Sequence, residues 1–347
     1  MKYHEFFRRS ALLKMVLAVI VLSFLASCEG AKKKKDEVDF SRSVSVSDSV
    51  DLLTSQIKKD SSDAGLWKER AGLYLKKGNI DAAFRDLNSA LELDKNDPEL
   101  YILLADIYFA IGKEDNSLSA IKKAIDLAPK NPDYYLKMAK FKLMLQKYRT
   151  AEAFADKVIS LDPENAQALY VKAIAALEQH DTIRALRMMK IATNLDTNFF
   201  AANLNVAVIL DARGDTGAIK YYKRALRIKP DNLITEYSLA MFYQKQGNFK
   251  KALETYEHNV GVHPEHAQSY YNMGYIYLTE YLDYNKAVEM FGKAIEADPD
   301  YTEAAYNLGR TYEAMGDTVR AMEKYRQALK LTTNYQLAID GLNRLEK

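Results

Sequence analysis

The stretch that decides the fold runs from residue 267 to residue 301 and reads AQSYYNMGYIYLTEYLDYNKAVEMFGKAIEADPDY. Its first half holds Tyr270, Gly274 and Tyr277, whose three- and four-residue spacing places them on one face of a helix. Its second half holds Ala287 and Phe291, which are four residues apart and so also share a helix face. The stretch therefore predicts two short helices joined by a turn, and similar stretches lie before and after it.

The prolines give the length of the repeated unit. The seven prolines of the chain stand at positions 98, 129, 132, 163, 230, 264 and 299. Steps of 34 or 35 residues join 98 to 132, 129 to 163, 230 to 264, and 264 to 299. A fixed period in this range is typical of a solenoid, in which each unit contacts only its neighbours.

The repeated unit resembles the tetratricopeptide repeat, a helix–turn–helix unit of about 34 residues. The resemblance rests on Tyr270, Met273-Gly274, Tyr277, Ala287, Phe291, Ala294 and Pro299, and on their equivalents in the other copies. It implies an all-α fold, a right-handed α-solenoid (superhelix) of eight tetratricopeptide units. We place the units at 64–97, 98–131, 132–165, 166–199, 200–232, 233–266, 267–301 and 302–335.

The two ends of such an array need cover, because a terminal unit otherwise leaves its apolar face in water. Residues 336–347 form an amphipathic segment, which predicts a C-terminal capping helix. Residues 49–63 carry Val50, Leu53 and Ile57 at helical spacing, which predicts an N-terminal capping helix.

Two positions of every unit hold a small residue, which lets the two helices of the unit approach closely. The eighth position holds Ala71, Ala105, Ala139, Ala173, Ala207, Ala240, Gly274 and Gly309. The twentieth position holds Ala83, Ser117, Ala151, Ala185, Ala218, Ala252, Ala287 and Ala321. Local irregularity is expected where the pattern departs: His180 replaces a turn glycine, the seventh unit has one extra residue, and Asn259 stands where most units have alanine.

The first 27 residues read as a secretory signal peptide. Basic residues come early, and an apolar run of 12 residues follows from Met15 to Ala26, shorter than the about 20 residues that a spanning helix needs. The run ends in Leu25-Ala26-Ser27-Cys28, which resembles a bacterial lipobox. The resemblance implies that Cys28, the only cysteine, carries the lipid (diacylglyceryl and palmitate) of a lipoprotein and anchors the chain in a membrane. The alternatives are an unmodified thiol or an uncleaved anchor.

A tether is expected between this anchor and the repeats, over residues 28–48. Serine stands at every second position from 41 to 49, which is typical of a flexible linker. The lysines at 32–35 either rest on anionic head groups or belong to a solvated linker, since acidic residues follow them at once.

Composition and motifs exclude several classes of function. The 49 basic residues balance 47 acidic ones, so nothing indicates a nucleic-acid partner. Asp215-Thr216-Gly217 matches an aspartic protease triplet, but equivalent Asp-Thr pairs occupy two other turns. The histidines at 258, 263 and 266 gather at one junction, but without the helical spacing of a metal site. We predict no catalytic residue, no metal and no cofactor, and hence no enzyme.

The candidate binding site is the wall that the first helices of the units form, which lines the inside of the superhelix in the family that the chain resembles. This wall is mixed in the first three units and becomes apolar and aromatic from the fourth. Large apolar side chains that the stacking of units does not need indicate a binding surface. The predicted groove residues are Tyr170, Ile174, Leu204, Val208, Tyr237, Met241, Tyr271, Tyr275 and Tyr306. The alternative is that these rings pack against a neighbouring unit.

The chaperone-tail form of the family grips a C-terminal carboxylate with paired Lys and Asn. Its matching positions here are Lys68, Gly72 and Leu103, without the asparagines, so that activity is not carried over. An extended or helical protein segment is the expected ligand instead.

The sequence as a whole predicts a lipid-anchored adaptor or scaffold of the bacterial cell envelope. Glu29 after the cysteine favours the outer membrane over the inner one by analogy, and surface exposure stays open. Two alternatives remain: a glycan-binding or enzyme-associated subunit of an envelope complex, and a purely structural spacer. The partner, the cellular process and the oligomeric state are not indicated.

Overall fold

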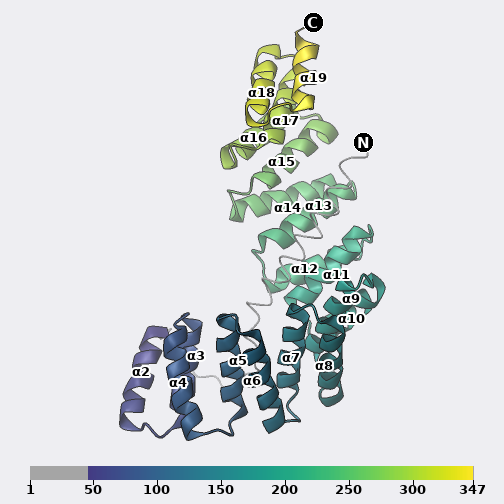
Figure 1. The fold of residues 1–347 in the computed structure, drawn as a ribbon. Helices are drawn as coiled ribbons and strands as arrows, with labels where there is room; N and C mark the ends of the chain where they lie inside the picture. The colour runs from purple at the N-terminus through teal and green to yellow at the C-terminus, as the bar shows by residue number, and fades with distance from the viewer. Residues whose placement is uncertain (1–45, 347) are drawn as a thin grey trace. The chain divides into compact units, whose positions relative to one another are not determined.

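The computed structural model describes residues 46–346, and every regular element in this range is helical (Figure 1). Eighteen α-helices and one π-helix follow one another here, which confirms the predicted all-α class. None of these helices is both long enough and apolar enough to cross a bilayer. The predicted signal peptide, Cys28 and most of the predicted tether lie outside the described residues.

The chain divides into two compact units, and the first ends at Thr197. Its described part begins with helix α2 (Val46–Lys59). Four hairpins follow, and within each the two helices pack closely. They are α3 (Ala64–Lys76) with α4 (Ile80–Leu93), α5 (Pro98–Ala110) with α6 (Glu114–Leu127), α7 (Pro132–Met144) with α8 (Tyr148–Leu161), and α9 (Ala166–Glu178) with α10 (Thr182–Leu195).

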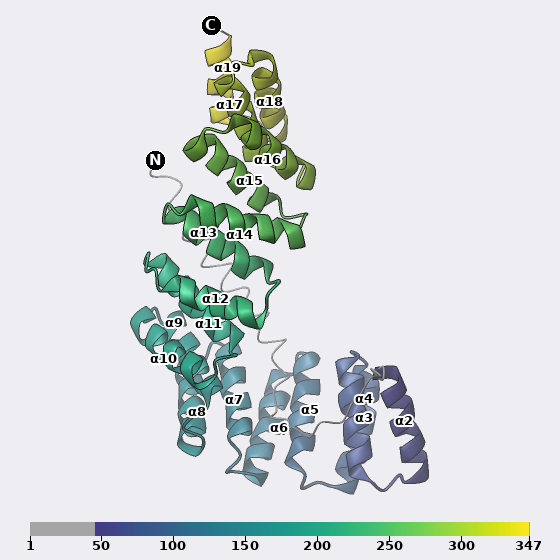
Figure 2. The same ribbon diagram turned by 180° about the vertical axis from the view of Figure 1, so that it is seen from behind.

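The second compact unit begins at Asn198 and contains four further hairpins (Figure 2). They are α11 (Phe200–Ala212) with α12 (Ala218–Ile228), α13 (Leu233–Lys245) with α14 (Phe249–Val262), α15 (Ala267–Ile276) and π-helix η1 (Tyr277–Tyr281) with α16 (Tyr284–Ala297), and α17 (Thr302–Ala314) with α18 (Thr318–Leu331). Helix α19 (Gln336–Leu345) follows and packs on α17 and α18.

Local sequence signals set where the helices begin. Pro98 and Pro132 each occupy the first turn, and the preceding Asp97 and Asn131 accept a hydrogen bond from a backbone N–H two residues on. Asp317 caps α18 in the same manner through the N–H of Arg320. Proline in the first turn and a side-chain oxygen just before the helix thus set these starts.

The small residues at the eighth and twentieth positions are buried in all eight hairpins, as predicted. In the second hairpin, Ser117 Oγ donates a hydrogen bond of 2.8 Å to the carbonyl of Ala105, which joins the two positions directly. Gly274 and Gly309 replace alanine because an aromatic ring fills the space. A Cβ on Gly309 would lie 2.8 Å from ring carbons of Tyr325.

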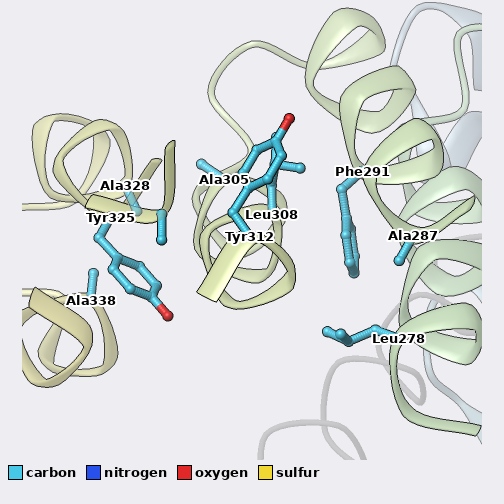
Figure 3. Close-up of a cluster of buried hydrophobic side chains, with 10 residues drawn as sticks. Leu278, Ala287, Phe291, Ala305, Leu308, Tyr312, Tyr325, Ala328 and Ala338 are labelled. Atoms are coloured by element: carbon cyan, nitrogen blue, oxygen red, sulfur yellow. The ribbon is translucent and has the colours of Figure 1, made fainter. Parts of the chain in front are cut away.

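The core of the last two hairpins shows how the end of the array is covered (Figure 3). Phe291 and Tyr325 project from the second helices and are fully buried among alanines. Ala338 of α19 packs against this cluster, and a Cβ on Gly341 would lie 2.5 Å from the Tyr325 ring. Helix α19 therefore closes the apolar side of the eighth hairpin. At the other end, α2 packs on α3 and buries Val50, Leu53 and Ile57.

The predicted irregularities have different outcomes. The extra residue of the seventh unit is absorbed in η1, after which Leu282 adopts a left-handed backbone conformation (φ 53°). His180 takes the left-handed conformation of the turn glycines (φ 63°). At Asn259 the expectation was wrong, because α14 continues through it to Val262 and the amide is buried and hydrogen-bonded.

Adding one methyl group at Gly309 is expected to destabilise the protein. In Gly309→Ala the new Cβ would meet the buried Tyr325 ring, and overpacking of this kind costs about 1–3 kcal/mol. Thermal unfolding followed by circular dichroism should show a lower midpoint. Gly292→Ala in α16 is the control, because its Cβ would have no neighbour within 4 Å and alanine favours a helix. Equal midpoints for the two variants would contradict the close approach of α17 and α18.

Candidate functional site

The structure separates the nine predicted groove residues into two groups by exposure. Tyr170, Ile174 and Leu204 are 4%, 3% and 7% exposed, so no partner can reach their side chains. The prediction that they line an open groove is therefore corrected, because these three side chains fill space inside the array. The other six are half-buried or exposed: Val208, Tyr237, Met241, Tyr271, Tyr275 and Tyr306.

Three of these tyrosines, Tyr237, Tyr271 and Tyr306, occupy the fifth position of the last three hairpins, and each contacts two other rings. The first contact is with a fully buried ring from the second helix of the same hairpin. The second is with the ring that ends the unit, just before the next first helix begins. The resulting three-ring clusters are Tyr237–Tyr256–His266, Tyr271–Phe291–Tyr301 and Tyr306–Tyr325–Tyr335, with centroids 4.9–5.9 Å apart.

Hydrogen bonds extend two of these clusters into the following hairpin. Asn272 Nδ2 donates to the Tyr237 hydroxyl at 3.0 Å, and Asn307 Nδ2 donates to the Tyr271 hydroxyl at 3.1 Å. Each of these tyrosines therefore joins its own hairpin to the next one. The three-ring clusters are part of the cohesion of the array, as the alternative interpretation of these rings proposed.

Burial in the clusters fixes the protonation of their polar rings. Burial raises the pKa of Tyr301, and it raises the pKa of Tyr335 to about 12. Burial, and then the charge of nearby His263, lower the pKa of His266 below its ordinary value. At neutral pH the phenols keep their protons and His266 is uncharged, so the clusters carry no charge of their own.

A smaller apolar surface remains open one helical turn beyond the clusters. Met241 follows Tyr237 on α13 and Tyr275 follows Tyr271 on α15, both by four residues, so each lies on the same helix face as its cluster tyrosine. Tyr275 is 38% exposed and Met241 is half-buried. Ile234, seven residues before Met241 on the same face, is 40% exposed. We call Ile234, Met241 and Tyr275 the apolar wall.

Ile234 was not among the predicted groove residues, although the sequence held a signal for it. It occupies the second position of its unit, on a first helix, and the first helices are the ones expected to line the inside. Val208, at the ninth position of its unit, is half-buried on α11. The second and ninth positions thus stay accessible in the second compact unit, whereas the fifth position is used for packing.

In the first three hairpins, several polar side chains of the first helices are paired. Lys68 Nζ lies 2.7 Å from Asp97, and Lys137 Nζ lies 2.5 Å from Asp106. The Tyr134 hydroxyl donates to Glu99 at 2.6 Å. Of the chaperone-tail positions, Lys68 is thus engaged with Asp97 inside the array.

The histidines at the junction of the sixth and seventh hairpins have three separate partners. His258 Nδ1 lies 2.5 Å from the buried carboxylate of Glu236, His263 contacts the carbonyl of Asp231, and His266 bonds the Ser269 hydroxyl. Within residues 46–346, no three His, Cys, Asp or Glu side chains gather as a metal site would require. The histidines therefore serve a hydrogen-bond network in this region.

The triplet that matches an aspartic protease lies in a turn between α11 and α12. Asp215 accepts a hydrogen bond of 2.8 Å from the backbone N–H of Gly217. Asp181 and Asp317 make comparable bonds at the starts of α10 and α18. The triplet is a turn element that recurs along the chain.

Family models agree with this architecture over most of the described residues. The model of the cytochrome c-type biogenesis protein H TPR domain matches residues 86–198. Tetratricopeptide repeat models match residues 64–107, 231–300 and 278–338. No curated protein is similar enough in sequence to count as a match.

Solved structures share the fold at low sequence identity. The C-terminal part of a TPR repeat-containing protein from Cytophaga hutchinsonii is 19% identical, with a TM-score of 0.60 over 69% of this chain and 98% of that one. The MamA protein is 22% identical, with a TM-score of 0.43 over 50% of this chain and 96% of that one. YrrB, described as a TPR protein with an unusual peptide-binding site, is 18% identical, with a TM-score of 0.40 over 65% and 99%. The first supports the fold, and the other two are too distant for any argument.

Removing a cluster ring should destabilise the array, whereas removing a ring of the apolar wall should not. Tyr271→Ala is expected to cost about 2–3 kcal/mol, since a half-buried ring and its contacts are lost. A double-mutant cycle with Tyr301→Ala should give a coupling energy of about 0.5–1.5 kcal/mol, the range of aromatic pairs. Tyr275→Ala, on the same helix, should change stability by less than about 0.5 kcal/mol.

Urea unfolding followed by circular dichroism measures these differences. A zero coupling between positions 271 and 301 would contradict the packing role of the clusters. So would a Tyr275→Ala variant that is as unstable as Tyr271→Ala.

Proposed function

Because this chain is a tetratricopeptide repeat protein, we propose that it acts as a protein–protein interaction adaptor of the bacterial cell envelope, anchored in a membrane through Cys28. A segment of a partner protein binds on the apolar wall of the second compact unit. The observation that carries the binding surface is that Ile234 and Tyr275 are exposed and Met241 is half-buried, on helix faces that the three-ring clusters already pack.

The chemistry of the apolar wall suits a protein segment. Tyrosine offers a broad ring with few rotamers and a polar tip, and methionine adapts its shape to different partners. Gln268 is exposed on α15, seven residues before Tyr275 on the same face, and supplies a polar group at the edge. An apolar centre with a polar rim is the arrangement of protein interfaces. One or two apolar side chains of a helical or extended segment would anchor on the wall.

The envelope location rests on the sequence before the described residues. The apolar run, the lipobox resemblance and the only cysteine coincide at Cys28. Glu29 favours the outer membrane by analogy. We infer no catalytic activity for the chain, because the acids and histidines named above serve turns, caps and the junction between hairpins.

A site-directed photocrosslinker tests the apolar wall in cells. A photoreactive residue in place of exposed Gln268 should label a partner protein, while one in place of exposed Lys293 on α16 should not. Combining the crosslinker at 268 with Met241→Ala and Tyr275→Ala should weaken labelling at least about tenfold, because central apolar contacts contribute over 1 kcal/mol each. Equal labelling with and without the two substitutions would leave the wall without a binding role.

Metabolic labelling with an alkyne fatty acid tests the anchor. The wild-type chain should take up the label and sediment with membranes, and Cys28→Ser should lose the label. Labelling of the Cys28→Ser variant, or an unmodified cysteine at the N-terminus of the mature protein, would exclude this anchor. The thermal unfolding midpoint of the repeats serves as the control and should be the same in both chains.

A further inference from the structure

Helix α12 carries a concentration of positive charge that the binding of a protein segment on the apolar wall does not use. It reads AIKYYKRALRI and buries Ala218, Tyr222 and Ala225 against the array. Lys220, Lys223 and Arg227 lie on the opposite, exposed face at spacings of three and four residues. We call these three residues the basic stripe. Its first and last members are seven positions apart, so the stripe extends about 10 Å along the helix.

The spacing of the basic stripe works against the helix itself. Like charges three or four residues apart on a helix repel each other and destabilise it. No aspartate or glutamate lies between Ala218 and Ile228 to offset them. The second helices of the other hairpins include acidic residues, with the exception of α10, whose Arg184 pairs with Glu152 from α8. The placement of Arg227 in the last turn, near the negative end of the helix dipole, compensates only in part.

The basic stripe has no ionic partner among the described residues. None of the ion pairs within residues 46–346 involves Lys220, Lys223 or Arg227. Lys220 instead lies 5.8 Å from the ring centre of half-buried Tyr221, beside the stripe.

The acids of the flanking segments are engaged elsewhere or lie at the ends of the helix. Asp211 pairs with Lys245 and accepts from Tyr222, and Asp215 accepts from a backbone N–H in the turn before α12. Asp231 follows the helix and is exposed. The positive charge of the stripe is therefore offered to solvent.

We propose that the basic stripe docks on an anionic phospholipid surface. Three cations in line on one exposed helix face match the negative charge of lipid head groups. The predicted anchor bears on the choice of this partner. Seventeen residues lie between Cys28 and Val46, the start of α2, so the chain between these two residues spans at most about 65 Å. Anchoring at Cys28 would hold the repeats close to such a surface, so this choice rests on the membrane attachment proposed above.

Vesicle binding tests the basic stripe separately from the anchor. The full chain with Cys28→Ser cannot be lipidated, and its binding to vesicles of phosphatidylcholine with 30% phosphatidylglycerol is compared with binding to phosphatidylcholine alone. The test variant carries Lys220→Glu, Lys223→Glu and Arg227→Glu. The control variant carries Lys58→Glu, Lys76→Glu and Lys122→Glu, three exposed lysines on three separate helices, and so has the same net charge.

The control variant should keep most of the preference for anionic vesicles. The test variant should bind these vesicles on the order of 100-fold more weakly, since each basic residue contributes about fivefold near such a surface, and the lysines at 32–35, which both variants keep, account for any preference that remains. Raising the salt concentration should weaken binding by the control variant and leave the test variant little changed. Thermal unfolding midpoints should show that both variants fold.

Two results would overturn the proposal. One is equal loss in the two variants, which would mean that net charge alone matters. The other is an absence of preference for anionic vesicles in the parent chain, which would leave an acidic protein surface as the partner of the basic stripe. Neither result bears on lipidation of Cys28, which the labelling experiment measures independently.

Discussion

The stacking of the last three hairpins depends on a contact between rings from three successive elements. The tyrosine at the fifth position touches the second helix of its own hairpin and the residue that precedes the next hairpin. In the first hairpin the same two positions hold Lys68 and Asp97, which form an ion pair. Two kinds of chemistry thus make the same connection between neighbouring units, a charged one at the start of the array and an aromatic one at its end.

The aromatic form of this contact replaces another stabilising interaction. Asp97 and Asn131 cap the following helix with a side-chain hydrogen bond, whereas His266, Tyr301 and Tyr335 do not. A lost cap costs about 1 kcal/mol, and a ring pair contributes about 0.5–1.5 kcal/mol beyond its buried area. The two nearly balance for a single helix. The gain lies in the connection between units. The ring of the last residue of a unit packs against its own hairpin, whereas a cap at that position stabilises only the helix that follows.

In these hairpins, packing between units and binding of a partner are therefore assigned to different positions of the unit. Fifth-position rings are committed to packing, so a partner meets the residues at the second and ninth positions instead. Ile234, Met241 and Tyr275 are the apolar members of that set in the sixth and seventh hairpins. The ring contacts beside them are already formed without a partner, so binding does not have to order these rings.

Much of the fold followed from the sequence, because its signals are local. These signals are the small residues at two positions, the prolines at helix starts and the period of 34 residues. Each acts within one hairpin, and the structure shows all of them. The fate of Tyr237 and Tyr271 could not be read in this way. Whether such a ring is accessible depends on a residue 29 or 30 positions later, His266 or Tyr301. It also depends on an asparagine amide in the first helix of the next hairpin. The spacing of residues along one helix face predicts the row of rings. It does not predict the rings and amides of other elements that pack on them.

The π-helical turn of the seventh hairpin shows how the array tolerates a change in length. The extra residue widens a single turn, and α16 still buries Ala287 and Phe291 against its neighbours. The hairpin tip can accommodate an insertion, because the helices on either side still turn the same faces toward their neighbours. Length variation in such arrays can accumulate at the tips over evolution, where the added side chains, here Tyr281 and Leu282, face solvent and are open to selection for new contacts.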